Sequence, residues 1–115
     1  MPSPPLVPDH GPIDADHLQS MTLGDAGLER EVLAMFSAQA AALIGALAGL
    51  PVDTTALAHT LKGSARAIGA FEVADAASAL EATVQTGGDP AQALIGLGEA
   101  IERARAAIDA ILRRS

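Results

Sequence analysis

The sequence contains no cysteine, no tryptophan and no tyrosine, and it has two phenylalanines. Without cysteine the chain has no disulfide framework, no thiolate metal site and no thiol nucleophile. With so few aromatic rings, a core must be packed mainly from alanine and leucine, which favours helices with closely spaced axes. Because half of the 115 residues are hydrophobic, the chain is long and apolar enough to bury one core and form one domain.

Positive charge is also scarce, since 7 lysines and arginines stand against 14 aspartates and glutamates. The resulting net charge of −7 argues against a partner that is recognised through nucleic-acid phosphates. No apolar run approaches the roughly 20 residues of a membrane span. The N-terminus lacks the basic and apolar regions of a signal peptide. We therefore expect a soluble cytoplasmic domain that binds neither nucleic acid nor a membrane.

Proline is concentrated at the N-terminus, where residues 1–12 hold five of the seven prolines. Proline fixes φ and removes a backbone donor, so these residues are predicted to form an extended or disordered arm before a domain at 13–115. From residue 13 onward, apolar residues recur at three and four, which is typical of helices, and no alternating strand pattern is present. The predicted helices cover residues 13–21, 27–50, 54–69, 71–85 and 90–114. Four long helices with short connections predict an all-α fold, namely an antiparallel up-down four-helix bundle with a short extra N-terminal helix.

Local signals mark the ends of several predicted helices. Thr22 or Asp25 is expected to cap the first long helix, and Asp53 and Asp89 are expected to cap the second and the fourth. Gly69 is expected to terminate the second long helix, because glycine readily takes the left-handed conformation that follows a helix.

One stretch of the second long helix carries polar residues that helix formation does not require. If each residue turns about 100° around the axis, two sides of this helix can be separated. The side predicted to face the core consists of Leu57, Leu61, Ser64 and Ile68. The side predicted to face water consists of His59, Lys62, Gly63, Arg66, Ala67 and Ala70.

The predicted exposed side combines residue types that suit phosphoryl transfer. The free nitrogen of a neutral imidazole is a nucleophile, which His59 would supply. Lys62 and Arg66 place positive charge about one and two turns away, as an incoming phosphoryl oxygen requires. Gly63 has no side chain one turn from His59, so another protein can approach the ring closely. Because one helix face is not concave, the phosphoryl group is expected to arrive on a macromolecule.

The plainer interpretation is a solvated helix face on which His59 has no role, since a histidine exposed on a helix is usually only a surface residue. Gly63 is harder to explain in that way, because a mid-helix glycine costs about 1 kcal/mol relative to alanine. His10 and His17 lie in the proline-rich arm and the short helix, and they are weaker candidates. Ser64 has no candidate base beside it, so a hydrolase triad finds no support.

The segment HTLKGSARAIGA, residues 59–70, resembles the signature of histidine-containing phosphotransfer (HPt) domains of bacterial phosphorelays. In that family the pattern is His, any residue, Leu, Lys, Gly, Ser and a small residue, with Gly or Ala closing the helix. The matching residues are His59, Leu61, Lys62, Gly63, Ser64, Ala65 and Gly69. Together with the helix order, the resemblance covers residues 13–115.

The resemblance implies a phosphocarrier without a kinase or ATP-binding domain. His59 would accept a phosphoryl group from an aspartate on the receiver domain of a hybrid histidine kinase and pass it to the receiver of a response regulator. Lys62 would help to hold the phosphoryl oxygens, and Ser64 would act structurally. The residues at the receiver-docking surface would be Gly63, Arg66, Ala67 and Ala70. The family implies a monomer with no metal site or cofactor of its own, because the magnesium belongs to the receiver.

The sequence departs from the family at one position. Several members carry a glutamine that hydrogen-bonds the imidazole, twenty-two residues after the histidine, where this chain has Glu81. A carboxylate there would accept from Nδ1 of His59 and orient the ring more strongly than an amide. The alternative is a solvated glutamate at a helix edge.

Two other classes of function remain open from the sequence. In the dimerisation part of a sensor kinase, an acidic residue and an Arg-Thr-Pro type run typically follow the histidine, and both are absent from residues 59–64. A non-catalytic helical interaction module would leave His59 silent. Formation of an acid-labile phosphoryl group on His59 would distinguish a carrier from such a module.

Overall fold

The computed structural model describes residues 11–114, and within that range it contains five helices and no strand. The helices are α1 (Ala15–Thr22), α2 (Ala26–Leu47), α3 (Thr54–Ile68), α4 (Phe71–Gln85) and α5 (Ala91–Arg114). The predicted all-α class is confirmed, and each predicted helix has its counterpart. The predicted arm falls mostly on residues 1–10, which lie outside the described residues.

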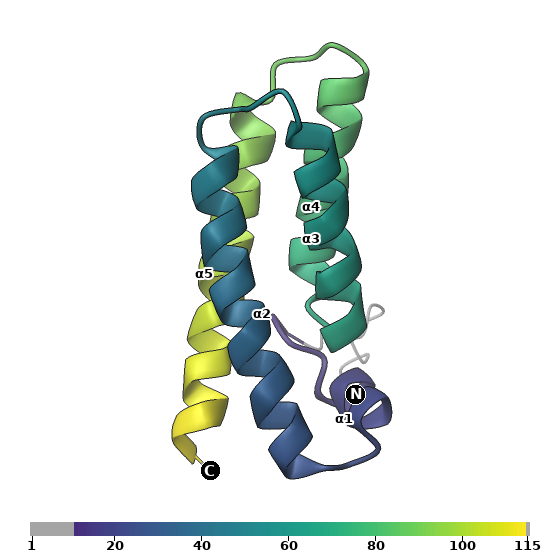
Figure 1. Cartoon of the computed structure of the whole chain (residues 1–115), viewed down its shortest axis with the longest axis vertical. Coiled ribbons are helices and arrows are strands. Elements are labelled where there is room, and N and C mark those ends of the chain that lie inside the picture. Colours follow the sequence, from purple (N-terminus) through teal and green to yellow (C-terminus); the bar gives the residue numbers. More distant parts are fainter. Residues whose placement is uncertain (1–10, 115) are drawn as a thin grey trace, which may run out of the picture.

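The four long helices pack side by side along the length of the molecule (Figure 1). Helix α2 contacts α3 and α5, and α4 contacts the same two helices, so the four enclose one core. Successive long helices run in opposite directions in Figure 1. The short helix α1 lies at one end of the molecule, where it contacts α2 and α3.

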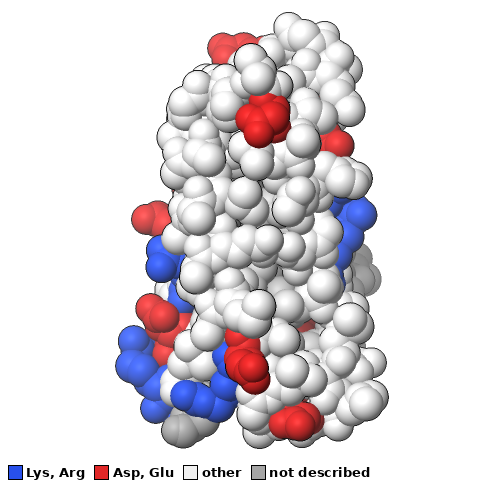
Figure 2. Space-filling view, in the orientation of Figure 1, with Lys and Arg blue, Asp and Glu red and all other residues white. Residues whose placement is uncertain are grey.

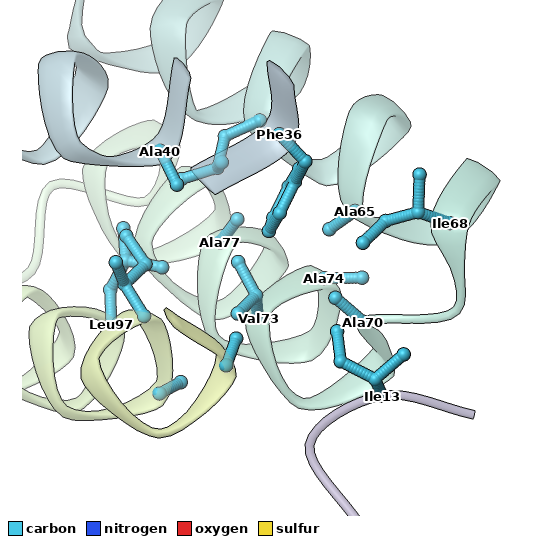
Figure 3. Packing of buried hydrophobic residues seen from close by; sticks show 14 of the residues in the cluster. Ile13, Phe36, Ala40, Ala65, Ile68, Ala70, Val73, Ala74, Ala77 and Leu97 are labelled. Atoms are coloured by element: carbon cyan, nitrogen blue, oxygen red, sulfur yellow. The ribbon is translucent and has the colours of Figure 1, made fainter. Parts of the chain in front are cut away.

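Small and medium aliphatic side chains fill the core, as the composition predicts. The largest side chains that are fully buried are Leu33, Leu47, Leu61, Leu80, Leu97, Ile108 and Val73. Several alanines with no exposed surface lie between them, and Figure 3 shows Ala65 and Ala77 among these together with the larger Phe36. Side chains this small let neighbouring helix axes approach closely, so the core needs few aromatic rings.

The predicted helix caps are largely confirmed. Asp25, and not Thr22, caps α2, because its side chain accepts a backbone N–H of the first turn at 3.0 Å. The Thr22 hydroxyl instead donates to the carbonyl of Leu18 at 2.9 Å, inside α1. Asp89 accepts the first backbone N–H of α5 at 3.0 Å. Asp53 occupies the cap position of α3, but its side chain makes no capping hydrogen bond.

Helix α2 requires a correction to the expectation that no segment approaches a membrane span. Among the described residues, one helix is long and apolar enough to cross a membrane, and that helix is α2, which has 22 residues. The evidence for a membrane span is length and composition alone, and core helices of globular domains often meet the same two criteria. Here α2 contacts α1, α3 and α5, and its buried residues contribute to the shared core.

A two-residue connection, Gly69 and Ala70, joins α3 to α4. Gly69 has a φ of 85°, which is left-handed backbone, and the amide of Ala70 donates to the carbonyl of Ala65 at 2.8 Å. This geometry terminates a helix and satisfies its last carbonyls, which confirms the role predicted for Gly69. The carbonyl of Gly69 also accepts the amide of Asp14 at 2.9 Å, so the same turn anchors the start of α1.

The burial of Ala70 contradicts its predicted place on the exposed side of the histidine helix. Ala70 has no exposed surface, and Figure 3 shows it beside Ile13 in the core. The helical rotation on which the prediction rests ends at Ile68, and the left-handed Gly69 then redirects the chain inward. Ala70 is therefore a core residue and not part of a docking surface.

The buried stripe of α3 is rotated slightly from the predicted one. Leu61 and Ile68 are buried as expected, whereas Leu57 and Ser64 are only half-buried. The full set of buried residues on α3 is Thr54, Ala58, Leu61, Ala65 and Ile68. Two of these buried residues are alanines, which are less hydrophobic than leucine. A prediction from hydrophobicity alone therefore places the centre of the buried stripe too close to Leu57.

We predict that Gly69→Ala destabilises the fold more than Gly87→Ala. Both glycines have positive φ, so either alanine suffers left-handed strain of about 1–2 kcal/mol. A Cβ on Gly69 would also lie 2.8 Å from the backbone oxygen of Asp14, whereas a Cβ on Gly87 meets nothing within 4 Å. Urea denaturation should give the larger loss of unfolding free energy for Gly69→Ala, and equal losses would contradict this role of the turn.

Candidate functional site

His59 lies in the middle of α3 on the side that faces away from the core. Its side chain is 68% exposed. Gly63 and Arg66, about one and two turns further along, are exposed as well, and so is Ala67. The structure therefore brings four of the sequence-predicted residues to one accessible helix face.

Glu81 of α4 connects two of the candidate residues on α3. One carboxylate oxygen, Oε2, lies 3.3 Å from Nδ1 of His59. The other oxygen, Oε1, accepts a hydrogen bond from Nζ of Lys62 at 2.8 Å. The Glu81 and Lys62 side chains are only 14% and 17% exposed, so this pair lies close to the protein surface but is well covered. Glu81 is thus a direct partner of the imidazole.

The short turn between α3 and α4 explains why these side chains meet. His59 lies eleven residues before Ala70, and Glu81 lies eleven residues after it. In two antiparallel helices joined by a tight turn, positions at equal distances from the turn lie side by side. Glu81 follows the buried Leu80 on α4, so it reaches α3 at the edge of the packed interface.

The electrostatics of the site favour an ionised carboxylate. The hydrogen bond from Lys62 is the main cause that lowers the pKa of Glu81 below its ordinary value of 4.5. The charge of Lys62 and the proximity of His59 lower this pKa further, while partial desolvation opposes them. Near neutral pH Glu81 is therefore negatively charged and can only accept hydrogen bonds.

A shallow apolar hollow lies next to this face, between α2 and α3. Its volume is about 230 Å³. The residues that line it are Val32, Met35, Phe36, Gln39, Ser64, Ala67 and Ile68. The sequence predicts that Ser64 faces the core, but it is half-buried and lines this hollow instead. Figure 2 shows that the face formed by α2 and α3 is mostly uncharged across its middle, with Lys and Arg side chains toward the margins.

His17 is not exposed on a helix face in the way that His59 is. His17 is half-buried, and its ring meets Phe71 edge to face with centroids 5.1 Å apart. Its Nε2 atom is buried and has no hydrogen-bond partner among the described residues. His17 therefore packs α1 against the start of α4, and His10 lies outside the described residues.

Sequence reasoning missed the Lys62–Glu81 pair and the hollow. The sequence predicts that the Lys62 ammonium holds a phosphoryl group, whereas in the structure this ammonium donates a hydrogen bond to Glu81. The two-residue connection after α3 is a usable signal, because it fixes which residues of α4 lie opposite His59 and Lys62. The hollow depends on how α2 packs against α3, which the pattern of either helix alone does not specify.

The fold and this site define an all-helical domain that presents one exposed histidine with a carboxylate on its ring. A family model described as the Hpt domain matches residues 31–113, which is well over half of the chain. The chain belongs to the Hpt domain family, and the resemblance drawn from residues 59–70 is confirmed. Hpt domains serve histidine phosphotransfer in phosphorelays and interact with receiver domains. Neither curated proteins nor solved structures gave a match.

We predict that Glu81 contributes to stability in a pH-dependent way. Because its pKa is lowered in the folded chain, its contribution is complete above the pKa of the unfolded chain. The contribution disappears as the pH falls through the lowered pKa. Urea denaturation from about pH 7 to about pH 3 should show Glu81→Gln less stable than wild type at neutral pH, with the difference vanishing in acid.

Lys62→Met provides the control for this stability measurement. Its hydrogen bond is the main cause of the lowered pKa of Glu81, so the pH-dependent difference should shrink when Lys62 is replaced. A difference between wild type and Glu81→Gln that does not change with pH would contradict the ionised pair.

Proposed function

We propose that this protein is a phosphorelay intermediate in which His59 carries the phosphoryl group. The observation that supports this most directly is the contact between Nδ1 of His59 and Glu81, on a ring that is 68% exposed. One ring nitrogen is oriented by the protein, and the other, Nε2, is left as the nucleophile for a partner. A silent surface histidine needs no such arrangement.

The transfer takes two steps, and each step exchanges one bond to phosphorus for another. The lone pair of Nε2 attacks the phosphorus of an aspartyl phosphate on the donor receiver, and the P–N bond forms as the P–O bond breaks. The donor carboxylate leaves with the electron pair. In the second step, a carboxylate oxygen of the acceptor aspartate attacks the phosphorus, and the electrons of the P–N bond return to Nε2.

The surroundings of His59 suit contact with a folded partner. Gly63 leaves open space beside the ring, because a Cβ there would meet nothing within 4 Å. Ala67 is small and exposed, and it borders the apolar hollow between α2 and α3. Arg66 supplies an exposed positive charge for an acidic rim on the receiver. We assign receiver docking to these three residues.

In the same proposal, the donor is the receiver domain of a hybrid histidine kinase and the acceptor is the receiver of a response regulator. The protein acts as a cytoplasmic monomer on an antiparallel up-down four-helix bundle, without nucleic acid or membrane as a partner. It uses no metal or cofactor of its own, and magnesium is bound by the receiver. Lys62 helps to hold the phosphoryl oxygens, because its ammonium has three N–H donors and one of them is used by Glu81.

We predict that His59→Gln abolishes phosphoryl acceptance and leaves the helical fold intact, because His59 is exposed and outside the core. Acceptance is measured as acid-labile label gained from a phosphorylated receiver, and folding by far-UV circular dichroism. His17→Gln is the control, since His17 is packed against Phe71. Acceptance by His59→Gln at the wild-type level would overturn the assignment.

We predict that substitutions at Gly63 change stability and transfer in opposite directions. Because the site is exposed and has room for a side chain, Gly63→Ala should stabilise α3 by up to about 1 kcal/mol, and Gly63→Gln by somewhat less. The Gln side chain should collide with the incoming receiver and slow transfer strongly, with Ala intermediate. Melting curves and transfer rates of the same samples test both effects.

Gly96→Gln is the matched control for Gly63→Gln. Gly96 is also a mid-helix position where an added Cβ would meet nothing within 4 Å, but it lies on α5, which does not contact α3. Transfer by Gly96→Gln should equal that of wild type. Wild-type transfer by Gly63→Gln as well would rule out a docking role for this glycine.

A further inference from the structure

The hollow between α2 and α3 leaves apolar side chains open to solvent. Met35 on its α2 side is 68% exposed, and Ala67 on its α3 side is exposed as well. No charged residue occurs in the sequence from residue 32 to residue 52, and Figure 2 shows an uncharged surface across the middle of this face. An exposed apolar hollow within a strongly charged chain is typical of a surface that binds another apolar segment.

The chain enters the domain beside this hollow. The amide of Asp14 donates to the carbonyl of Gly69 at 2.9 Å, and Gly69 directly follows Ile68, which lines the hollow. Residue 10 precedes Asp14 by four positions, and four residues span at most about 14 Å. Residues 1–10, which lie outside the described residues, are therefore joined to the domain within reach of the hollow.

The sequence of residues 1–10 contains a short apolar segment that suits the hollow. Residues 4–8 read PPLVP, with Leu6 and Val7 between prolines and no charge. Burial of this segment therefore desolvates no ionised group. Because proline fixes φ, the segment loses less conformational entropy on binding than a segment without proline would. The hollow of about 230 Å³ has room for at least one aliphatic side chain, since a cavity of about 150 Å³ holds benzene.

The covalent link favours this segment over a second copy of the chain as the occupant. A short linker holds its segment at an effective concentration in the millimolar range, well above that of a separate protein in dilute solution. A second copy would also bring another net charge of −7 to the same surface. The segment of the same molecule is therefore the occupant that the chain itself supplies.

We propose that residues 4–8 bind in the hollow of the same molecule, where Leu6 and Val7 lie against Met35, and that they cover part of the receiver-docking surface. This inference rests on the proposed function, because Ala67 borders the hollow and belongs to the proposed docking surface. A receiver must displace the segment in order to dock. The segment therefore lowers the receiver affinity in proportion to the share of molecules in which the hollow is covered.

The first measurement is methyl NMR of the full chain without a partner. With the Met, Leu and Val methyl groups labelled with ¹³C, wild type should show nuclear Overhauser contacts from Met35 to Leu6 or Val7. Met21 is the internal control, since it is also exposed but does not line the hollow, and it should show no such contact. Absence of the Met35 contacts would overturn the proposal. Contacts that form only at high protein concentration would assign the hollow to a second copy and overturn it as well.

Serine substitutions provide the matched variants. The double variant Leu6→Ser and Val7→Ser should lose the contacts and shift the Met35 methyl resonance. Ile95→Ser is the control, because Ile95 is also an exposed aliphatic residue but lies on α5, which does not contact α3. The Met35 resonance should stay at its wild-type position in this control. An unchanged resonance in the double variant, or an equal shift in Ile95→Ser, would contradict the proposal.

The second measurement follows the effect on a partner. The probe is a receiver domain that phosphorylates the wild-type protein, and its affinity in the unphosphorylated form is measured by titration calorimetry. The double variant should bind this receiver about tenfold more tightly than wild type, the factor expected if the segment covers the hollow in about nine of ten molecules. Ile95→Ser should bind as wild type does. Equal or weaker binding by the double variant would show that the segment does not compete with the receiver.

The two measurements separate this inference from the proposed function. If no phosphorylated receiver transfers its group to wild type, the carrier function is wrong, and the methyl spectra still decide whether residues 4–8 cover the hollow. If transfer to wild type occurs and the methyl contacts are absent, the carrier function stands and this inference is wrong.

Discussion

The two-residue turn between α3 and α4 determines which side chains of the two helices meet at the site. Left-handed Gly69 ends α3, reverses the chain and accepts a hydrogen bond from the start of α1. With the turn fixed, the alignment of α3 against α4 is fixed as well, and Glu81 lies beside His59. A longer connection would let α4 slide along α3, and the carboxylate would no longer reach the ring.

The two sides of α3 have different roles, since one side packs in the core and the other carries the candidate reactive residue. The inner side of α3 packs through Ala58, Leu61 and Ala65, which have no exposed surface. The outer side carries His59 and Gly63, which nothing in the core requires. A reactive group on a rigid helical hairpin is held in place without a pocket around it, and this suits a substrate that arrives on another protein. The pair of Lys62 and Glu81 lies at the boundary between the two sides.

Much of this organisation can be predicted from the sequence, because local signals determine it. Apolar spacing locates the helices, and Gly69 ends α3 as expected. Rotation about a single helix places His59 on the exposed side. The same reasoning fails for Ala70, where the helix has already ended, and for Ser64, whose burial depends on how α2 packs. Contacts between helices, above all the pairing of Lys62 with Glu81, require the turn geometry in addition to the pattern.

The proposed function requires that His59 carry the phosphoryl group on Nε2 while Nδ1 stays hydrogen-bonded to Glu81. The most direct measurement is ³¹P and ¹⁵N NMR of the labelled protein after it has been mixed with a phosphorylated receiver. We expect one acid-labile phosphoryl group, bonded to Nε2 of His59. A phosphoryl group bonded to Nδ1, attached to a different residue, or stable to acid as a hydroxyl ester would contradict it.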